Sequence, residues 1–93
     1  MQHCLISGAR SGVIVQDGRE TRAQITLNLN RIQNCKNNGH AILLNGLHGD
    51  PNVAIGWNEI TNQFGLSQPS DAINIYQSSG TPGRPILVHN NFV

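Results

Sequence analysis

The chain has 93 residues, enough for one small domain, but 38% hydrophobic and 4% aromatic residues would supply an isolated compact core poorly. The formal charge of +1 and the 12% of charged residues provide neither a basic surface for nucleic acid nor a polybasic patch for a membrane. No apolar run approaches the length of a transmembrane helix, and residues 1–4 lack the regions of a signal peptide.

Short apolar segments alternate with turns along the whole chain. Twelve asparagines and ten glycines favour those turns, because glycine permits positive φ and asparagine bonds its own backbone. Within the segments, apolar residues alternate with polar ones, which is typical of strands with one buried face. In chain order, the expected strand segments are 3–7, 12–16, 25–29, 30–34, 41–45, 53–55, 58–62, 72–76, 86–88 and 91–93.

These segments recur in a fixed order. Residues 30–34, Asn-Arg-Ile-Gln-Asn, return 28 positions later as residues 58–62, Asn-Glu-Ile-Thr-Asn, and Asn91 begins the pattern again 33 positions further on. Residues 3–7 are placed in the same frame 27 positions before residues 30–34, which aligns Leu5 with Ile32. A fixed order of apolar segments at such a period predicts a solenoid with three short strands in each rung.

Alternation along the segments predicts which side chains are buried. Equivalent residues of neighbouring rungs would lie about 4.8 Å apart, so the corner residues Asn30, Asn58 and Asn91 are expected to stack and to hydrogen-bond their amides in a row. The side chains expected inside are Val13, Val15, Ile25, Leu27, Leu29, Ile42, Leu44, Val53, Ile55, Ile73, Ile75, Ile86 and Val88.

The two cysteines fall at different places in the repeat, Cys4 on a strand segment and Cys35 in a turn. A disulfide would have to cross register, so we expect two free thiols. The sequence contains no CxxC, HExxH or EF-hand pattern and no phosphate-binding glycine loop. We therefore predict neither a metal ion nor a cofactor.

The repeat pattern has a recognisable counterpart. V-x-I-x-x-N-x-I-x-N at residues 53–62, with G-x-A-I-x-L at residues 39–44, resembles the repeats of right-handed parallel β-helices of the pectate-lyase-like superfamily, over essentially all 93 residues. The resemblance implies an all-β fold with roughly three rungs, and an extracellular or cell-surface location. Because no capping helix flanks the segments, we expect residues 1–93 to be a single partial, uncapped β-helix domain with further rungs of a longer chain beside it.

Function is less specific than fold, because this architecture carries polysaccharide lyases, glycoside hydrolases, uronate epimerases, tailspikes and adhesins. One hypothesis is a carbohydrate-active or carbohydrate-binding module whose partner is an acidic polysaccharide. The alternative is a non-catalytic structural segment of an adhesin, tailspike or surface protein.

Members of the superfamily bind sugar chains beside the first strand of each rung, so the resemblance implies a site in the loops there. In register, Glu20 aligns with His48 and Arg22 with Asp50. Such pairs suit general acid/base catalysis, and Arg22 and Arg84 suit a sugar carboxylate. The alternative is that they form exposed salt bridges of little energetic weight.

A second candidate pair, His40 and Asp71, aligns at the start of two first strands. His40 would be a base oriented by Asp71, whereas the alternative is that Asp71 forms an Asx-type turn. The outward row Gln16, Asn45 and Tyr76 is expected to hydrogen-bond hydroxyl groups and stack a sugar ring, or else to be an ordinary exposed polar face.

Trp57 is also expected to point outward. It is either covered by the long turn at residues 63–70 or exposed as a platform for a sugar ring. Coverage by the turn is the interpretation we favour from the sequence.

Overall fold

The computed structural model describes residues 1–16, 20–21, 24–49 and 52–93, without the side chains of residues 20 and 21. The described part of the chain is all-β, and it contains no helix that is long and apolar enough to cross a membrane. The strands are β1 (Leu5–Ser7), β2 (Val13–Gln16), β3 (Glu20–Thr21), β4 (Gln24–Asn28), β5 (Arg31–Gln33), β6 (His40–Asn45), β7 (His48–Gly49), β8 (Asn52–Gly56), β9 (Glu59–Thr61), β10 (Asp71–Tyr76) and β11 (Ile86–His89).

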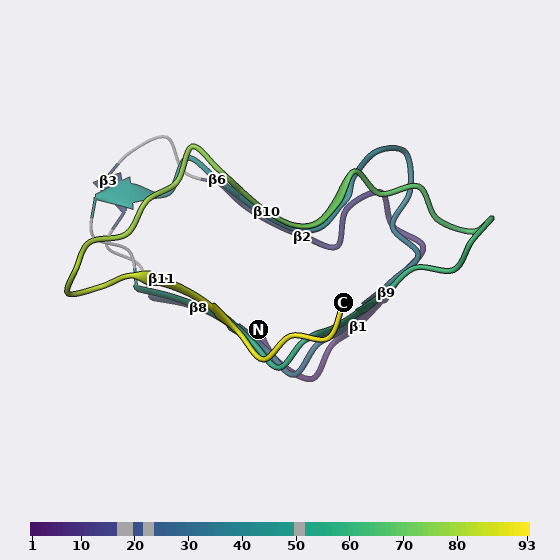
Figure 1. Ribbon diagram of the computed structural model, residues 1–93, viewed down its shortest axis with the longest axis horizontal. Helices are drawn as coiled ribbons and strands as arrows, with labels where there is room; N and C mark the ends of the chain where they lie inside the picture. Colours follow the sequence, from purple (N-terminus) through teal and green to yellow (C-terminus); the bar gives the residue numbers. More distant parts are fainter. Residues whose placement is uncertain (17–19, 22–23, 50–51) are drawn as a thin grey trace.

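Each strand pairs in parallel with the strand one repeat away. The orders β1-β5-β9, β10-β6-β2 and β11-β8-β4 make three three-stranded sheets, and β3 pairs with β7. Successive circuits of the chain therefore overlie one another, with β2, β6 and β10 along one long side of the outline and the other two large sheets along the opposite side (Figure 1). This arrangement is compatible with the predicted solenoid.

The core lies between the sheets and is most complete in the middle circuit. Ile42, Leu44, Val53 and Ile55 are fully buried, as the alternation predicts, and each such side chain contributes about 1.5–3 kcal/mol through removal of apolar surface from water. Among the described strands, β10 and β11 pair with a neighbour on one side only. Of their residues expected inside, Ile73 and Ile86 pack against the core. Ile75 and Val88 do not, and they are 40% and 44% exposed.

The predicted frame of the first repeat is wrong by one residue. Leu5 pairs with Arg31, and Ile6 with Ile32, so Ile6 packs against the core while Leu5 is 65% exposed. Cys4 takes the corner position, where its backbone N–H donates to Asn30 Oδ1 at 3.2 Å. Leu5 and Ile6 are adjacent apolar residues that fit either register, and a one-residue slip exchanges the two faces of a strand.

A second correction concerns Leu29, which is not inside. His3, Leu29, Trp57 and Asn90 occupy equivalent corner positions with φ between 52° and 58°, the left-handed region that large side chains rarely adopt. The strand alternation ends at this corner. Leu29 is consequently 47% exposed and Trp57 58% exposed, so the long turn does not cover the indole.

The next corner position holds the asparagine row. Asn58 Oδ1 accepts hydrogen bonds from the backbone N–H of Asn30 at 3.1 Å and from its side-chain amide at 3.0 Å. Asn58 Nδ2 donates to Asn91 Oδ1 at 3.0 Å and to the Leu27 carbonyl at 2.9 Å. Asn58 is 1% exposed, and these bonds satisfy polar groups that would otherwise be costly to bury.

Candidate functional site

The predicted loop cluster is described only in part. Glu20 and His48 are partners in the parallel β3–β7 pair, which is the register that the sequence predicts, and His48 is half-buried. Arg22, Asp50 and the side chain of Glu20 lie outside the described residues. The catalytic role assigned to this cluster therefore stays a prediction.

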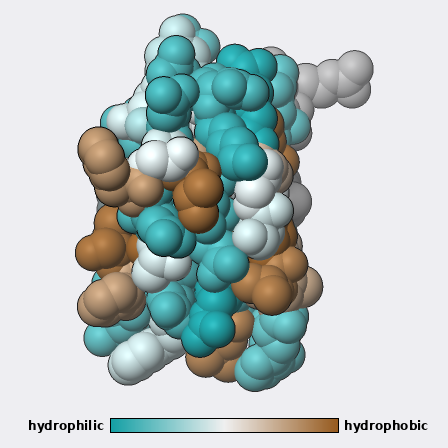
Figure 2. All heavy atoms as spheres, turned by 90° about the vertical axis from the view of Figure 1, so that its right-hand side faces the viewer, coloured by the Kyte–Doolittle hydropathy of each residue, from teal (hydrophilic) through white to brown (hydrophobic). Residues whose placement is uncertain are grey.

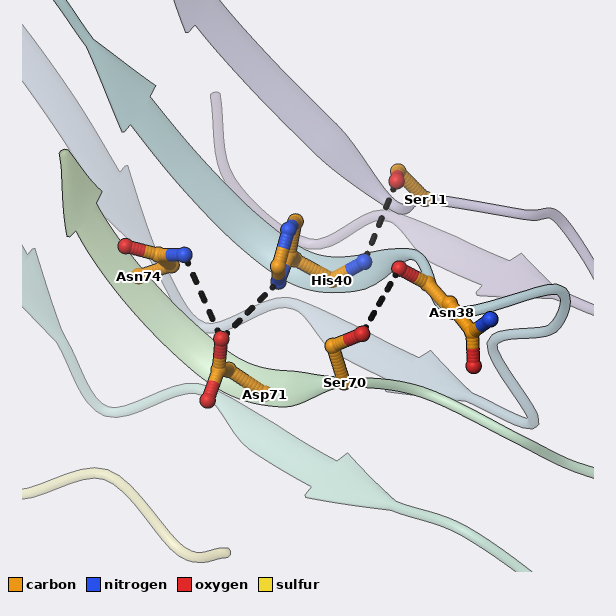
Figure 3. A network of polar contacts seen from close by, with 6 residues as sticks. All are labelled: Ser11, Asn38, His40, Ser70, Asp71 and Asn74. Atoms are coloured by element: carbon orange, nitrogen blue, oxygen red, sulfur yellow. Dashed lines mark hydrogen bonds and ion pairs between the residues drawn. The ribbon is translucent and has the colours of Figure 1, made fainter.

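The second candidate pair does come together. His40 and Asp71 are the first residues of β6 and β10 and are register partners. His40 Nδ1 lies 3.4 Å from Asp71 Oδ2, an ion-pair distance longer than an ordinary hydrogen bond. Asn74 Nδ2 donates to the same oxygen at 3.2 Å, which holds the carboxylate beside the imidazole (Figure 3).

A break in the strand alternation places His40 next to this carboxylate. Ala41 and Ile42 are consecutive and both fully buried. The side chains that point outward are therefore His40, before this pair, and Leu43, after it. The backbone N–H of His40 donates to Ser11 Oγ at 3.1 Å. Bonds from the neighbouring turns thus fix the start of β6, and the side chain of His40 keeps 19% exposure.

Close packing of the preceding turns supports the site. Ser70 donates through its hydroxyl to the Asn38 carbonyl at 2.9 Å and through its backbone N–H to the Gly39 carbonyl at 2.8 Å. A Cβ on Gly39 would collide with the Arg10 carbonyl oxygen and lie 2.7 Å from Ser11 Oγ. Only glycine therefore allows the two turns to approach this closely.

An open hollow of about 400 Å³ lies beside His40. Its floor includes the outward side chains of Ile14 and Leu43, and the guanidinium-bearing Arg10 lines its rim. Arg10 is anchored because its Nε donates to the Asn37 carbonyl at 3.2 Å. An imidazole and a guanidinium therefore line a hollow with an apolar floor, and the Asp71 carboxylate contacts the imidazole. This arrangement can bind an anionic ligand and move a proton near it.

Sequence reasoning did not identify Arg10 as part of a site. It lies in the shortest of the three turns that precede β2, β6 and β10. Its position in the repeat could have indicated it. The turns before β2 and β6 stack, so Arg10 comes next to the residues that precede His40. The distances within such stacked turns depend on side-chain packing, which carries no period in the sequence.

The remaining predicted binding residues lie on β2, β6 and β10 and in the turn that precedes β11. Gln16, Asn45 and Tyr76 are register partners at the far ends of β2, β6 and β10, and Gln16 and Tyr76 are exposed. Arg84 is half-buried and closes a turn in which it exchanges backbone hydrogen bonds with Thr81 at 3.0 and 3.1 Å. The predicted polar row thus exists, whereas its role in binding is untested.

Both thiols are free, Cys4 exposed and Cys35 buried. Burial raises the pKa of Cys35 above the ordinary thiol value, although a backbone hydrogen bond with Gly12 acts in the opposite direction. Within the described ranges, no three His, Cys, Asp or Glu side chains form a group that could hold a metal ion.

Comparison with known proteins returns no match: no family model, no curated protein and no solved structure is significantly similar to the chain. Any functional conclusion therefore depends on the chemistry of the site itself. The hollow beside His40 is the place where that chemistry is most concentrated among the described residues.

Proposed function

We propose that the chain is a right-handed parallel β-helix module of the pectate-lyase-like kind that binds an acidic polysaccharide across the outer face of β2, β6 and β10. The row Asn30, Asn58 and Asn91 is, in this proposal, the asparagine ladder that stiffens one corner of the helix. One observation carries the functional part: His40 and Asp71 are in contact next to an open hollow that Arg10 also lines.

The chemistry of the hollow supports an anionic, ring-shaped ligand. Arg10 presents a planar group that matches a carboxylate in a bidentate manner. The apolar floor of Ile14 and Leu43 suits the C–H face of a sugar ring. His40, held beside Asp71 and Asn74, is then the group that exchanges a proton with the bound sugar.

Titration calorimetry with polygalacturonate and alginate, and with dextran as the neutral reference, tests the proposal. Binding to an acidic polymer is expected to weaken in His40→Ala and Asp71→Asn. His89→Ala is the matched control, because His89 is an exposed histidine on β11, in a different sheet. Equal binding by the wild type and both site variants would remove this pair from the function.

The alternative is a structural segment with no ligand. The stacked core and the Arg31–Glu59 ion pair across β5 and β9, at 3.0 Å, favour it because they serve the fold alone. In that case no polysaccharide of the panel binds the wild-type chain.

A further inference from the structure

A second hollow lies at the long turn before β10. Residues 62–70 leave the stack and return to it, and the return is fixed by backbone hydrogen bonds to the turn below. Gln68 donates to the Cys35 carbonyl at 2.9 Å and accepts from the backbone N–H of Asn38 at 2.8 Å. The base of this turn is therefore tied to the neighbouring circuit.

The tip of the turn is also ordered. Leu66 N–H donates to the Gln63 carbonyl at 3.0 Å, and Ser67 Oγ donates to the same oxygen at 2.8 Å. Gly65 lies between Gln63 and Leu66 and has a φ of 84°, a conformation that glycine adopts without strain. The chain thus builds a defined turn at a place where it packs against little else.

The tip presents apolar side chains to solvent. Phe64 is fully exposed and Leu66 is 52% exposed, although turn positions usually carry polar residues. Because the fold gains almost nothing from Phe64, its apolar surface remains available for burial against a ligand.

A hollow of about 510 Å³ lies between this tip and the turn below it. Phe64 and Leu66 contribute apolar side chains to its lining, and Lys36, Asn37, Ser67 and Gln68 contribute polar ones. Figure 2 views the side of the molecule that bears these turns and shows apolar side chains standing among hydrophilic ones. The volume falls within the range of small-ligand sites.

Lys36 is the single lysine of the chain. Within the described part of the chain, no carboxylate lies at ion-pair distance from its ammonium group. Its charge is therefore not committed to the fold. A ligand with an anionic group near Lys36 and an apolar ring face at Phe64 complements the hollow in both charge and polarity.

We infer that this hollow is a subsite for one acidic sugar residue, with the ring stacked on Phe64, the carboxylate at Lys36 and hydroxyl groups at the amides of Asn37 and Gln68. The identity of the ligand as a sugar rests on the proposed function. Asn37 lines this hollow and Asn38 lines the one beside His40, and in this inference one polysaccharide chain reaches both hollows.

The test measures the Kd of oligogalacturonate and of a neutral galacto-oligosaccharide of the same length, with the whole chain. Phe64→Ala is expected to raise the Kd for oligogalacturonate about threefold to tenfold, the worth of one aromatic contact. Lys36→Gln is expected to raise it for the acidic ligand only and to flatten its salt dependence.

Phe92→Ala and Arg31→Gln are the matched controls, because Phe92 is an exposed phenylalanine and Arg31 an exposed cation outside this hollow. Phe64 and Lys36 are exposed, so their replacement leaves the fold intact, and an unchanged backbone amide spectrum verifies this. The controls are expected to keep the wild-type Kd.

Three results would overturn the inference. The first is equal affinity of the wild type for the acidic and neutral ligands. The second is an unchanged Kd in Phe64→Ala and Lys36→Gln while His40→Ala still weakens binding; this second result would leave the proposed function standing. The third is Phe64-dependent binding to phosphatidylserine vesicles with no oligosaccharide binding, which would identify the tip as a membrane contact and reject both proposals.

Discussion

Replacement of Asn58 by alanine is the sharpest test of the stacked corner. The side chain of Asn58 takes part in four hydrogen bonds, two accepted from Asn30 and one donated to each of Leu27 and Asn91. All four connect different circuits of the chain. The change removes all four bonds in a place where Asn58 is 1% exposed. The Asn30 amide keeps its bond to the Met1 carbonyl and Asn91 Oδ1 keeps the backbone N–H of residue 58, whereas the backbone N–H of Asn30 and the Leu27 carbonyl lose the bonds to this side chain.

The expected loss is large. A protein hydrogen bond contributes a net of about 1 kcal/mol, and an unsatisfied buried group costs about 1–3 kcal/mol, so Asn58→Ala should lower the free energy of unfolding by about 4 kcal/mol. Domains of this size are stable by roughly 5–14 kcal/mol. The variant should therefore retain only a small margin of stability.

Urea unfolding followed by far-ultraviolet circular dichroism measures this loss. Asn30→Ala should cost about 2–3 kcal/mol, because Asn30 Oδ1 accepts one bond, from Cys4, and its amide donates to Asn58 and to the Met1 carbonyl. Asn52→Ala, at an exposed position of β8, is the control and should stay within about 0.5 kcal/mol of the wild type. A cost for Asn58→Ala below about 1 kcal/mol, or equal to that of the control, would refute the reasoning.

Four further predictions concern the backbone and the thiols. Leu29→Asn should raise the free energy of unfolding by about 1 kcal/mol, because asparagine tolerates the left-handed backbone better than leucine; a drop in the urea midpoint would contradict this. Gly39→Ala should lower it by about 1–3 kcal/mol or more, because its Cβ meets the Arg10 carbonyl, and an unchanged melting temperature would disagree. In the native protein a thiol reagent should modify exposed Cys4 quickly and buried Cys35 only on unfolding. Since burial raises the pKa of Cys35, its contribution to stability is complete below the ordinary thiol pKa of 9.0 and is lost as the pH rises through the higher folded value; two equally fast thiols would argue against this burial.

The pairing of the strands was predictable because two independent periods agree. Alternation of apolar residues specifies which side chains of β2, β6 and β10 face inward, and the spacing of the repeats specifies which residues are neighbours. Val13, Ile42 and Ile73 accordingly lie in one row, as do Ile25, Val53 and Ile86. Both signals follow from the two-residue repeat of a strand and the rung length, which are properties of the backbone.

Prediction failed where neither period applies. At the first repeat, Leu5 and Ile6 satisfy either register, and the choice is made by corner hydrogen bonds that the sequence does not display. At the corner before the asparagine row, Leu29 and Trp57 adopt positive φ, so extending the alternation through Leu29 gives the wrong face. Bulky residues are the least expected at such positions.

In the candidate site, too, one part could be predicted from the repeat and another part could not. The register between His40 and Asp71 follows from the repeat and is confirmed. The outward placement of His40 depends on the break at Ala41, and the position of Arg10 depends on how the turns pack at Gly39. Both features depend on how side chains and turns pack in the folded chain, and no sequence pattern indicates them.

The long turn at residues 62–70 bears on how this architecture can evolve. Its return is anchored at Gln68 and Ser70, downstream of the protruding tip, so extra residues inserted between Gln63 and Gln68 would enlarge the protrusion without displacing β9 or β10. The length of this loop can therefore change without changing the register of the strands. A scaffold of this kind can acquire new recognition surfaces by insertion, and a grafted peptide could be displayed at the same position.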